Sequence, residues 1–89
     1  MLFNYKIIKE KTGYDVEACW RVVVAEVNAG NKINLKIRLG NCIDDIAKLT
    51  KNTDELMAAN EIAAAVVHNT AKNEFVNLKN YIENALKTV

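Results

Sequence analysis

A chain of 89 residues, 51% hydrophobic and 26% charged, has the composition of one small globular domain, which argues against an intrinsically disordered chain. Twelve basic and eleven acidic side chains leave a formal net charge of +1, so overall charge does not indicate a polyanionic partner. No apolar run approaches the roughly 18 residues of a membrane span, and the N-terminal segment lacks the features of a secretory signal. We therefore expect a single cytoplasmic domain over residues 1–89 that does not contact a membrane.

The cysteine and histidine content makes a metal site improbable. Two cysteines and one histidine are fewer than the four ligands that a structural zinc usually takes. Cys19 and Cys42 are far apart in sequence, and in a reducing compartment two mostly buried free thiols are the expected state. A disulfide between them is the less favoured alternative. We expect no metal and no cofactor.

Proline is absent, so glycine and asparagine mark the expected turns, at residues 11–13, 28–31 and 40–41. These turns divide the first part of the chain into segments of strand length. The first predicted strand covers residues 3–9. The clearest covers residues 32–39, where apolar and polar residues alternate strictly, and this alternation places Ile33, Leu35, Ile37 and Leu39 on one buried face.

Residues 19–27 permit two interpretations. Their β-branched side chains and the following turn favour a strand that pairs with residues 32–39 in a hairpin. The alternative is an amphipathic helix, for which Asp15 is a good N-cap. Its apolar stripe would consist of Val16, Cys19, Trp20, Val23 and Val27. The valine run and the alternation that follows favour the strand, although the two patterns overlap.

After residue 40 the pattern becomes helical. We expect helices over about 42–49, 54–69 and 73–87, with Asn41 or Asp44 capping the first, Thr53 capping the second, and a break at residues 51–52. The inner face of the last helix is predicted to contain Phe75, Leu78, Ile82, Ala85 and Leu86. The predicted fold class is therefore α+β: a three-stranded antiparallel meander followed by two or three helices packed on one face of the sheet.

Polar residues give little support for catalysis. His68 has no nucleophile at a useful spacing, so an exposed or capping role is expected. Asp44 with Asp45, and Asp54 with Glu55, fall where helix N-termini favour negative charge. The isolated glycines form no phosphate-binding loop. We expect a protein that is not an enzyme.

Charge is distributed unevenly along the chain. Residues 1–40 carry seven basic and four acidic side chains, a balance of +3, whereas residues 41–89 carry five and seven, a balance of −2. If the predicted strands bury their apolar side, the outer face of the sheet is basic. The candidate DNA-contacting residues on this half are Lys6, Arg21, Lys32, Asn34, Lys36 and Arg38. A basic sheet face of this kind could enter a DNA major groove. The alternative is that these residues are polar only because they face solvent, which explains the same pattern.

Several short segments resemble the ethylene-response-factor (Apetala-type) DNA-binding domain and the related integrase arm-binding domain. Tyr-Lys-Ile-Ile at residues 5–8 is similar to that family's Tyr-Arg-Gly-Val, and Trp-Arg-Val-Val-Val at 20–24 is similar to its Trp-x-Ala-x-Ile. Residues 37–40, 53–55, 67–69 and 74–78 resemble later parts of the same domain. The resemblance implies a DNA-binding module from a phage or mobile element, with Arg21, Lys36 and Arg38 contacting double-stranded DNA. It also implies that Trp20 contacts the DNA sugar-phosphate backbone or packs beneath the sheet.

A protein-interaction role is the alternative hypothesis. The last predicted helix is more apolar than one thin layer of core requires, and small domains of near-neutral charge often complete their cores by dimerising. The candidate interface residues are Phe75, Leu78, Tyr81, Ile82 and Leu86. On this hypothesis the protein is an oligomeric assembly factor, a homodimer being the simplest case, or an inhibitor of a host enzyme.

Overall fold

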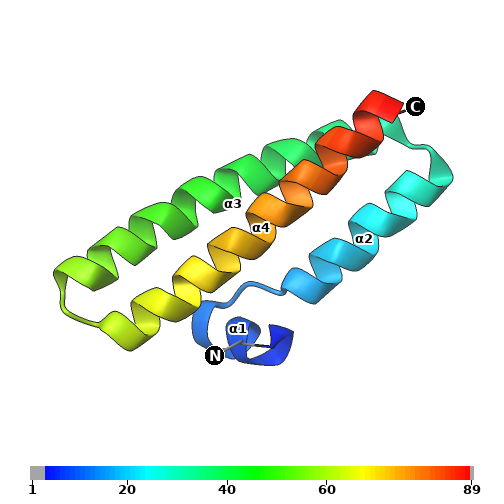
Figure 1. Ribbon diagram of the computed structural model, residues 1–89. Helices are drawn as coiled ribbons and strands as arrows, with labels where there is room; N and C mark the ends of the chain where they lie inside the picture. The colour runs from blue at the N-terminus through cyan, green and yellow to red at the C-terminus, as the bar shows by residue number, and fades with distance from the viewer. Residues whose placement is uncertain (1–3, 89) are drawn as a thin grey trace.

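The computed structural model describes residues 4–88, and within this range every regular element is an α-helix (Figure 1). The elements are α1 (Tyr5–Thr12), α2 (Val16–Ala29), α3 (Lys32–Ala58) and α4 (Ile62–Thr88). α3 and α4 have 27 residues each and form a long antiparallel hairpin. α2 packs against both long helices, and α1 packs against α4 and α2. The hairpin sets the length of the molecule, which measures 45 × 21 × 18 Å.

The predicted three-stranded meander is wrong, and the fold is all-α rather than α+β. Residues 5–9 of the first predicted strand lie in α1, residues 19–27 lie in α2, and residues 32–39 form the first turns of α3. Phe3, where the first strand was predicted to begin, lies outside the described residues. No strand is present in residues 4–88.

Residues 32–39 are helical because their inner side chains belong to a longer helical stripe. Leu35 and Leu39 turn inward, whereas Ile33 and Ile37 point outward and are 74% and 57% exposed. From Leu35 to Leu49, apolar residues recur every three or four positions, and Leu56 follows Leu49 by seven. This spacing keeps one side of a helix against a partner helix. The inward members of this stripe are Leu35, Leu39, Cys42, Ile46, Leu49 and Leu56. Burial along this whole stripe outweighs the local alternation of eight residues.

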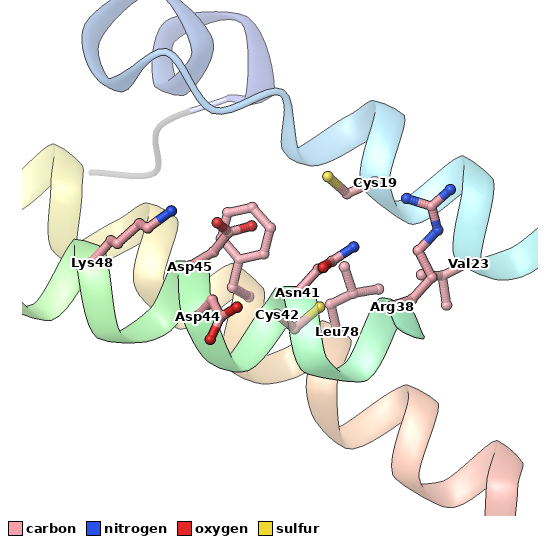
Figure 2. Close-up of a pocket in the computed structure, with 10 residues that line it drawn as sticks. Cys19, Val23, Arg38, Asn41, Cys42, Asp44, Asp45, Lys48 and Leu78 are labelled. Carbon is pink, nitrogen blue, oxygen red and sulfur yellow. The ribbon is translucent and has the colours of Figure 1, made fainter. Parts of the chain in front are cut away.

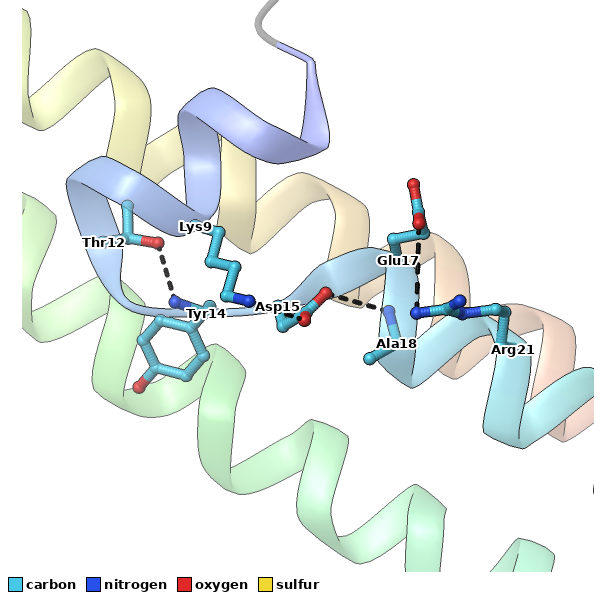
Figure 3. A network of polar contacts seen from close by, with 7 residues as sticks. All are labelled: Lys9, Thr12, Tyr14, Asp15, Glu17, Ala18 and Arg21. Atoms are coloured by element: carbon cyan, nitrogen blue, oxygen red, sulfur yellow. Dashed lines mark hydrogen bonds and ion pairs between the residues drawn. The ribbon is translucent and has the colours of Figure 1, made fainter.

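The helical interpretation of the segment after Asp15 is confirmed. The Asp15 carboxylate accepts a hydrogen bond from the Ala18 N–H at 3.0 Å, which satisfies one free donor at the start of α2 (Figure 3). Val16 and Val23 are buried, and the helix ends at Gly30. The turns predicted at 11–13 and 28–31 are also confirmed: Gly13 and Gly30 have φ of 83° and 68°, where a side chain would be strained.

The predicted turn at residues 40–41 and the predicted break at 51–52 are wrong, because α3 continues through both. Asn41, Asp44 and Thr53 are therefore not N-caps, and the Thr53 hydroxyl instead donates to the Leu49 carbonyl at 2.7 Å within the helix. The predicted helix over 54–69 is also wrong, because the chain reverses at residues 59–61, where Asn60 takes a left-handed φ of 62° between α3 and α4. α4 then continues unbroken through residues 69–73, since nothing there removes a backbone donor.

The core lies where α1, α2 and α3 meet α4. The predicted inner face of the last helix is confirmed, because Phe75, Leu78, Ile82 and Ala85 are buried. Other core residues come from all four helices: Ile8, Val16, Val23, Leu35, Cys42, Leu49 and Ala71. No polar or charged residue within 4–88 is buried, so the interior is held together by apolar contact.

Candidate interaction surfaces

The residues predicted to contact DNA do not share one face. Lys6 lies on α1 and Arg21 lies on α2, and both are exposed. Arg21 is 3.9 Å from the Glu17 carboxylate, and the neighbouring Lys9 is 3.3 Å from Asp15 (Figure 3). The cations of this corner of the molecule are thus interleaved with carboxylates, which reduces the positive potential that a phosphate backbone would meet.

The remaining predicted contacts are divided around α3. Successive helical positions differ by about 100°, so Lys32 and Lys36 lie on one side of the helix and Asn34 and Arg38 lie on another. Asn34 donates to the Glu26 carboxylate of α2 at 3.1 Å, and Arg38 lines a groove between α2 and α3. DNA binding stays a prediction, without the common basic surface that motivated it.

The alternative interface residues lie largely in the protein's own core. Phe75, Leu78 and Ile82 are at most 1% exposed, and Leu86 is half-buried beside them. Tyr81 is 37% exposed, and its ring makes an edge-type contact with the ring of Trp20, with centroids 5.5 Å apart. The apolar surplus of the last helix is thus used to hold α1, α2 and α3.

A groove of about 270 Å³ separates α2 from α3 (Figure 2). Phe75 and Leu78 of α4 form part of its lining, together with Cys19 and Val23 of α2. The α3 residues along the groove are Arg38, Asn41, Cys42, Asp44, Asp45 and Lys48. Two cations and two carboxylates balance each other there, so the groove has no net charge with which to select a charged ligand.

The two thiols in this groove are poorly suited to nucleophilic chemistry. Burial, with smaller contributions from Cys19 and Asp45, raises the pKa of Cys42 to about 11, and burial also raises the pKa of Cys19. Because the thiolate is the reactive form, both cysteines are protonated and unreactive near neutral pH. They are free thiols in the structure.

Asp45 on the same groove gives a prediction for stability against pH. Burial raises the pKa of Asp45, Lys48 lowers it and Asp44 raises it further, with a net upward shift. Ionisation is therefore harder in the folded protein than in the unfolded chain, so the charged carboxylate reduces stability at neutral pH and this penalty disappears as the pH falls and the group is protonated. We expect Asp45→Asn to raise the melting temperature slightly at pH 7 and to match the wild type at pH 3.

The control for Asp45→Asn is Asp54→Asn, at an exposed position of the same helix. Thermal unfolding followed by circular dichroism at both pH values measures the difference. A lower melting temperature for Asp45→Asn at pH 7 would show that the carboxylate makes a favourable contact in the groove.

The other polar residues considered for catalysis or metal binding lie within helices and form no such site in the described residues. His68 Nδ1 donates to the Ala64 carbonyl at 2.8 Å, one turn earlier in α4. Among residues 4–88 no group of three or more His, Cys, Asp or Glu side chains lies close enough together to hold a metal ion. The carboxylates expected to cap helix starts, Asp44, Asp45, Asp54 and Glu55, lie inside α3.

The outward side of α3 carries an exposed apolar surface, which we call the α3 outer face. Its residues are Ile33, Lys36, Ile37, Gly40, Ile43, Asp44 and Ala47. Ile33, Ile37 and Ile43 are 74%, 57% and 48% exposed, in contrast to the buried positions predicted for the first two. Gly40 and Ala47 follow Ile33 at intervals of seven residues, so these three positions lie on one line along the helix.

The outward side of α4 is chemically different. Its exposed positions are uncharged amides: Asn69, Asn73, Asn77, Asn80 and Asn84. Large apolar side chains on α4 are exposed near its N-terminal end, where Ile62 and Val66 are each 47% exposed, and at Tyr81, which is 37% exposed. Sequence reasoning missed the α3 outer face because it assigned Ile33 and Ile37 to a buried sheet face; helical spacing beyond residue 39 is the signal that identifies it.

Comparison with protein-family models, with curated proteins and with solved structures finds no match for this chain. Across residues 4–88, none of the four helices combines the length and the apolar character needed to cross a bilayer. We therefore infer a function from the chain's own surfaces.

Proposed function

We propose that the protein is a non-enzymatic assembly module that works as an oligomer, associating through the α3 outer face. The observation that carries the proposal is the exposure of Ile33, Ile37 and Ile43 on one side of a single helix. Scattered exposed apolar residues are ordinary in soluble proteins, whereas large side chains repeated along one helix face are typical of helix-to-helix docking.

The other surfaces support this choice. The α2–α3 groove is balanced in charge and has protonated thiols, and the α4 outward side is made of asparagine amides, which remain hydrated at little cost. A cytoplasmic location, expected from the sequence, belongs to the same proposal, because reducing conditions maintain Cys19 and Cys42 as free thiols.

Replacing one isoleucine of the α3 outer face by aspartate tests the proposal. The Ile37→Asp variant places a charge on the apolar surface and is expected to sediment as a monomer of about 10 kDa. The wild type is expected to sediment as a larger, concentration-dependent species. Analytical ultracentrifugation from micromolar to millimolar concentration measures both.

Val66→Asp is the matched control, because Val66 is similarly exposed but lies on α4. It should self-associate like the wild type, and the circular dichroism of all three proteins should be the same. A wild type that stays monomeric at every concentration, or equal association of Ile37→Asp and wild type, would contradict the proposed function.

A further inference from the structure

Gly40 lies in the middle of α3, at an exposed position where its own chain gives no reason for glycine. An added Cβ would meet no atom within 4 Å other than the adjoining residues and backbone of α3 itself, and φ lies in the range open to any residue. Glycine inside a helix is destabilising relative to alanine, because it gains no packing and loses more backbone freedom. Its one structural benefit here is that another backbone can approach the helix closely.

The side of α3 that carries Gly40 lies opposite the buried residues Leu35, Cys42 and Leu49 of the same helix. Asp44, at the edge of this side, also lines the α2–α3 groove. Ile33 and Ala47 lie on the same line as Gly40, one on each side of it. Lys36 and Ile37 precede Gly40 by one helical turn, and Ile43 and Asp44 follow it by one turn. The surface is thus apolar along its centre, with one cation before the glycine and one anion after it.

We propose that two copies of this chain pack α3 against α3 in antiparallel orientation, with the two-fold axis at the level of Gly40. This inference rests on the proposed function and specifies its partner and register. An antiparallel two-fold axis brings residues equally distant from Gly40 to the same level on the two helices. Ile33 then lies opposite Ala47 of the second copy, Ile37 lies level with Ile43, and Lys36 lies level with Asp44.

The charges select the orientation of the pair. In the antiparallel register each Lys36 faces an Asp44, twice in the dimer because of symmetry. A parallel pair would place Lys36 beside Lys36 and Asp44 beside Asp44, which is unfavourable. The lack of a side chain at Gly40 allows the helices to approach to the short end of the usual interaxial distance, roughly 8 Å.

The contact is one helix pair of about four turns, which is small among protein interfaces, so we expect a dissociation constant on the order of micromolar. At this affinity, a change in the dissociation constant caused by charge reversal can be measured. Lys36→Asp and Asp44→Lys should each raise the dissociation constant by roughly tenfold or more, because like charges then face each other twice. The double variant Lys36→Asp/Asp44→Lys restores opposite charges and should return to within about threefold of the wild type.

Gly40→Gln provides a second test in which stability and association change in opposite directions. Glutamine is a better helix former than glycine, so thermal stability of the dilute monomer should rise. Its side chain fills the gap at the two-fold axis, so the dimer should weaken by roughly tenfold or more. A merely structural role of Gly40 would not separate these two effects.

Sedimentation equilibrium of the full chain, these four variants and Ile37→Asp decides the outcome. Rescue by the double variant, together with loss of dimer in Gly40→Gln, supports the antiparallel pair. A dimer that Ile37→Asp abolishes but single charge reversals leave unchanged, or a double variant as weak as the singles, overturns this register while the proposed function stands. A wild type that never dimerises overturns both.

Discussion

The Phe75→Ala variant is expected to lose about 3–5 kcal/mol of unfolding free energy, one of the two largest effects that the structure predicts. Phe75 lies in the middle of α4 and is 1% exposed. Its ring meets Tyr14, in the linker between α1 and α2, with centroids 5.6 Å apart. Truncation therefore leaves a cavity at the point where α1 and α2 are held to the hairpin of α3 and α4. Chemical denaturation followed by circular dichroism measures the loss.

Val66→Ala on the same helix is the control for Phe75→Ala, because its side chain is 47% exposed and leaves no enclosed cavity. Its stability should stay within about 1 kcal/mol of the wild type. Equal losses for the two variants would mean that α4 does not bury the Phe75 side as described.

The Lys51→Pro variant is expected to destabilise the protein by about 3 kcal/mol or more. Lys51 is exposed and its side chain makes one surface ion pair, with Glu55 at 4.0 Å. Proline there removes a hydrogen bond inside α3 and clashes with the preceding turn. The same substitution would be tolerated at a break between two short helices, which is what the sequence predicted at residues 51–52. Thermal or urea unfolding distinguishes the two outcomes.

Lys51→Ala separates the backbone effect from loss of the side chain. Exposed ion pairs contribute little, so this control should change stability by no more than about 0.5 kcal/mol. A proline variant as stable as the alanine variant would contradict a continuous α3.

The fold was predictable from the sequence where a helix end has its own chemical signal. Asp15 is the N-cap of the helical alternative for the segment that follows it, and Gly13 and Gly30 are predicted turn residues. These predictions succeed because a carboxylate acceptor and a residue tolerant of left-handed φ are local requirements. Gly40 has the same side chain and was predicted as a turn. It differs only in lying on the outward side of a helix, which depends on how the rest of α3 packs.

The strand prediction failed because alternation over eight residues is compatible with a helix that has apolar side chains on two sides. In residues 32–39, Leu35 and Leu39 are one helical turn apart, as are Ile33 and Ile37. The pattern is resolved only when the window extends to Leu56 and the inward stripe emerges. Cooperative packing of α3 against α4, both 27 residues long, decides the outcome.

The candidate surface could not be predicted at the same stage. A large apolar residue is identified as exposed only when the buried face of its element is known, and Ile33 and Ile37 were assigned to the buried face of a strand. The basic residues were grouped on the same assumption: alternate positions share a face in a strand and separate in a helix. Because residues 32–39 are helical and not a strand, the predicted basic DNA surface does not form and an apolar surface is exposed instead.

Residue-resolved amide chemical shifts, recorded as the protein is diluted from millimolar to low micromolar concentration, test the assembly proposal most directly. We expect shifts typical of helix throughout residues 32–58, with concentration-dependent changes centred on Gly40 and extending along the α3 outer face to Ile33 and Ala47. The asparagines of α4 should not change. Concentration-dependent changes confined to α4, or none on α3 at millimolar protein, would contradict it.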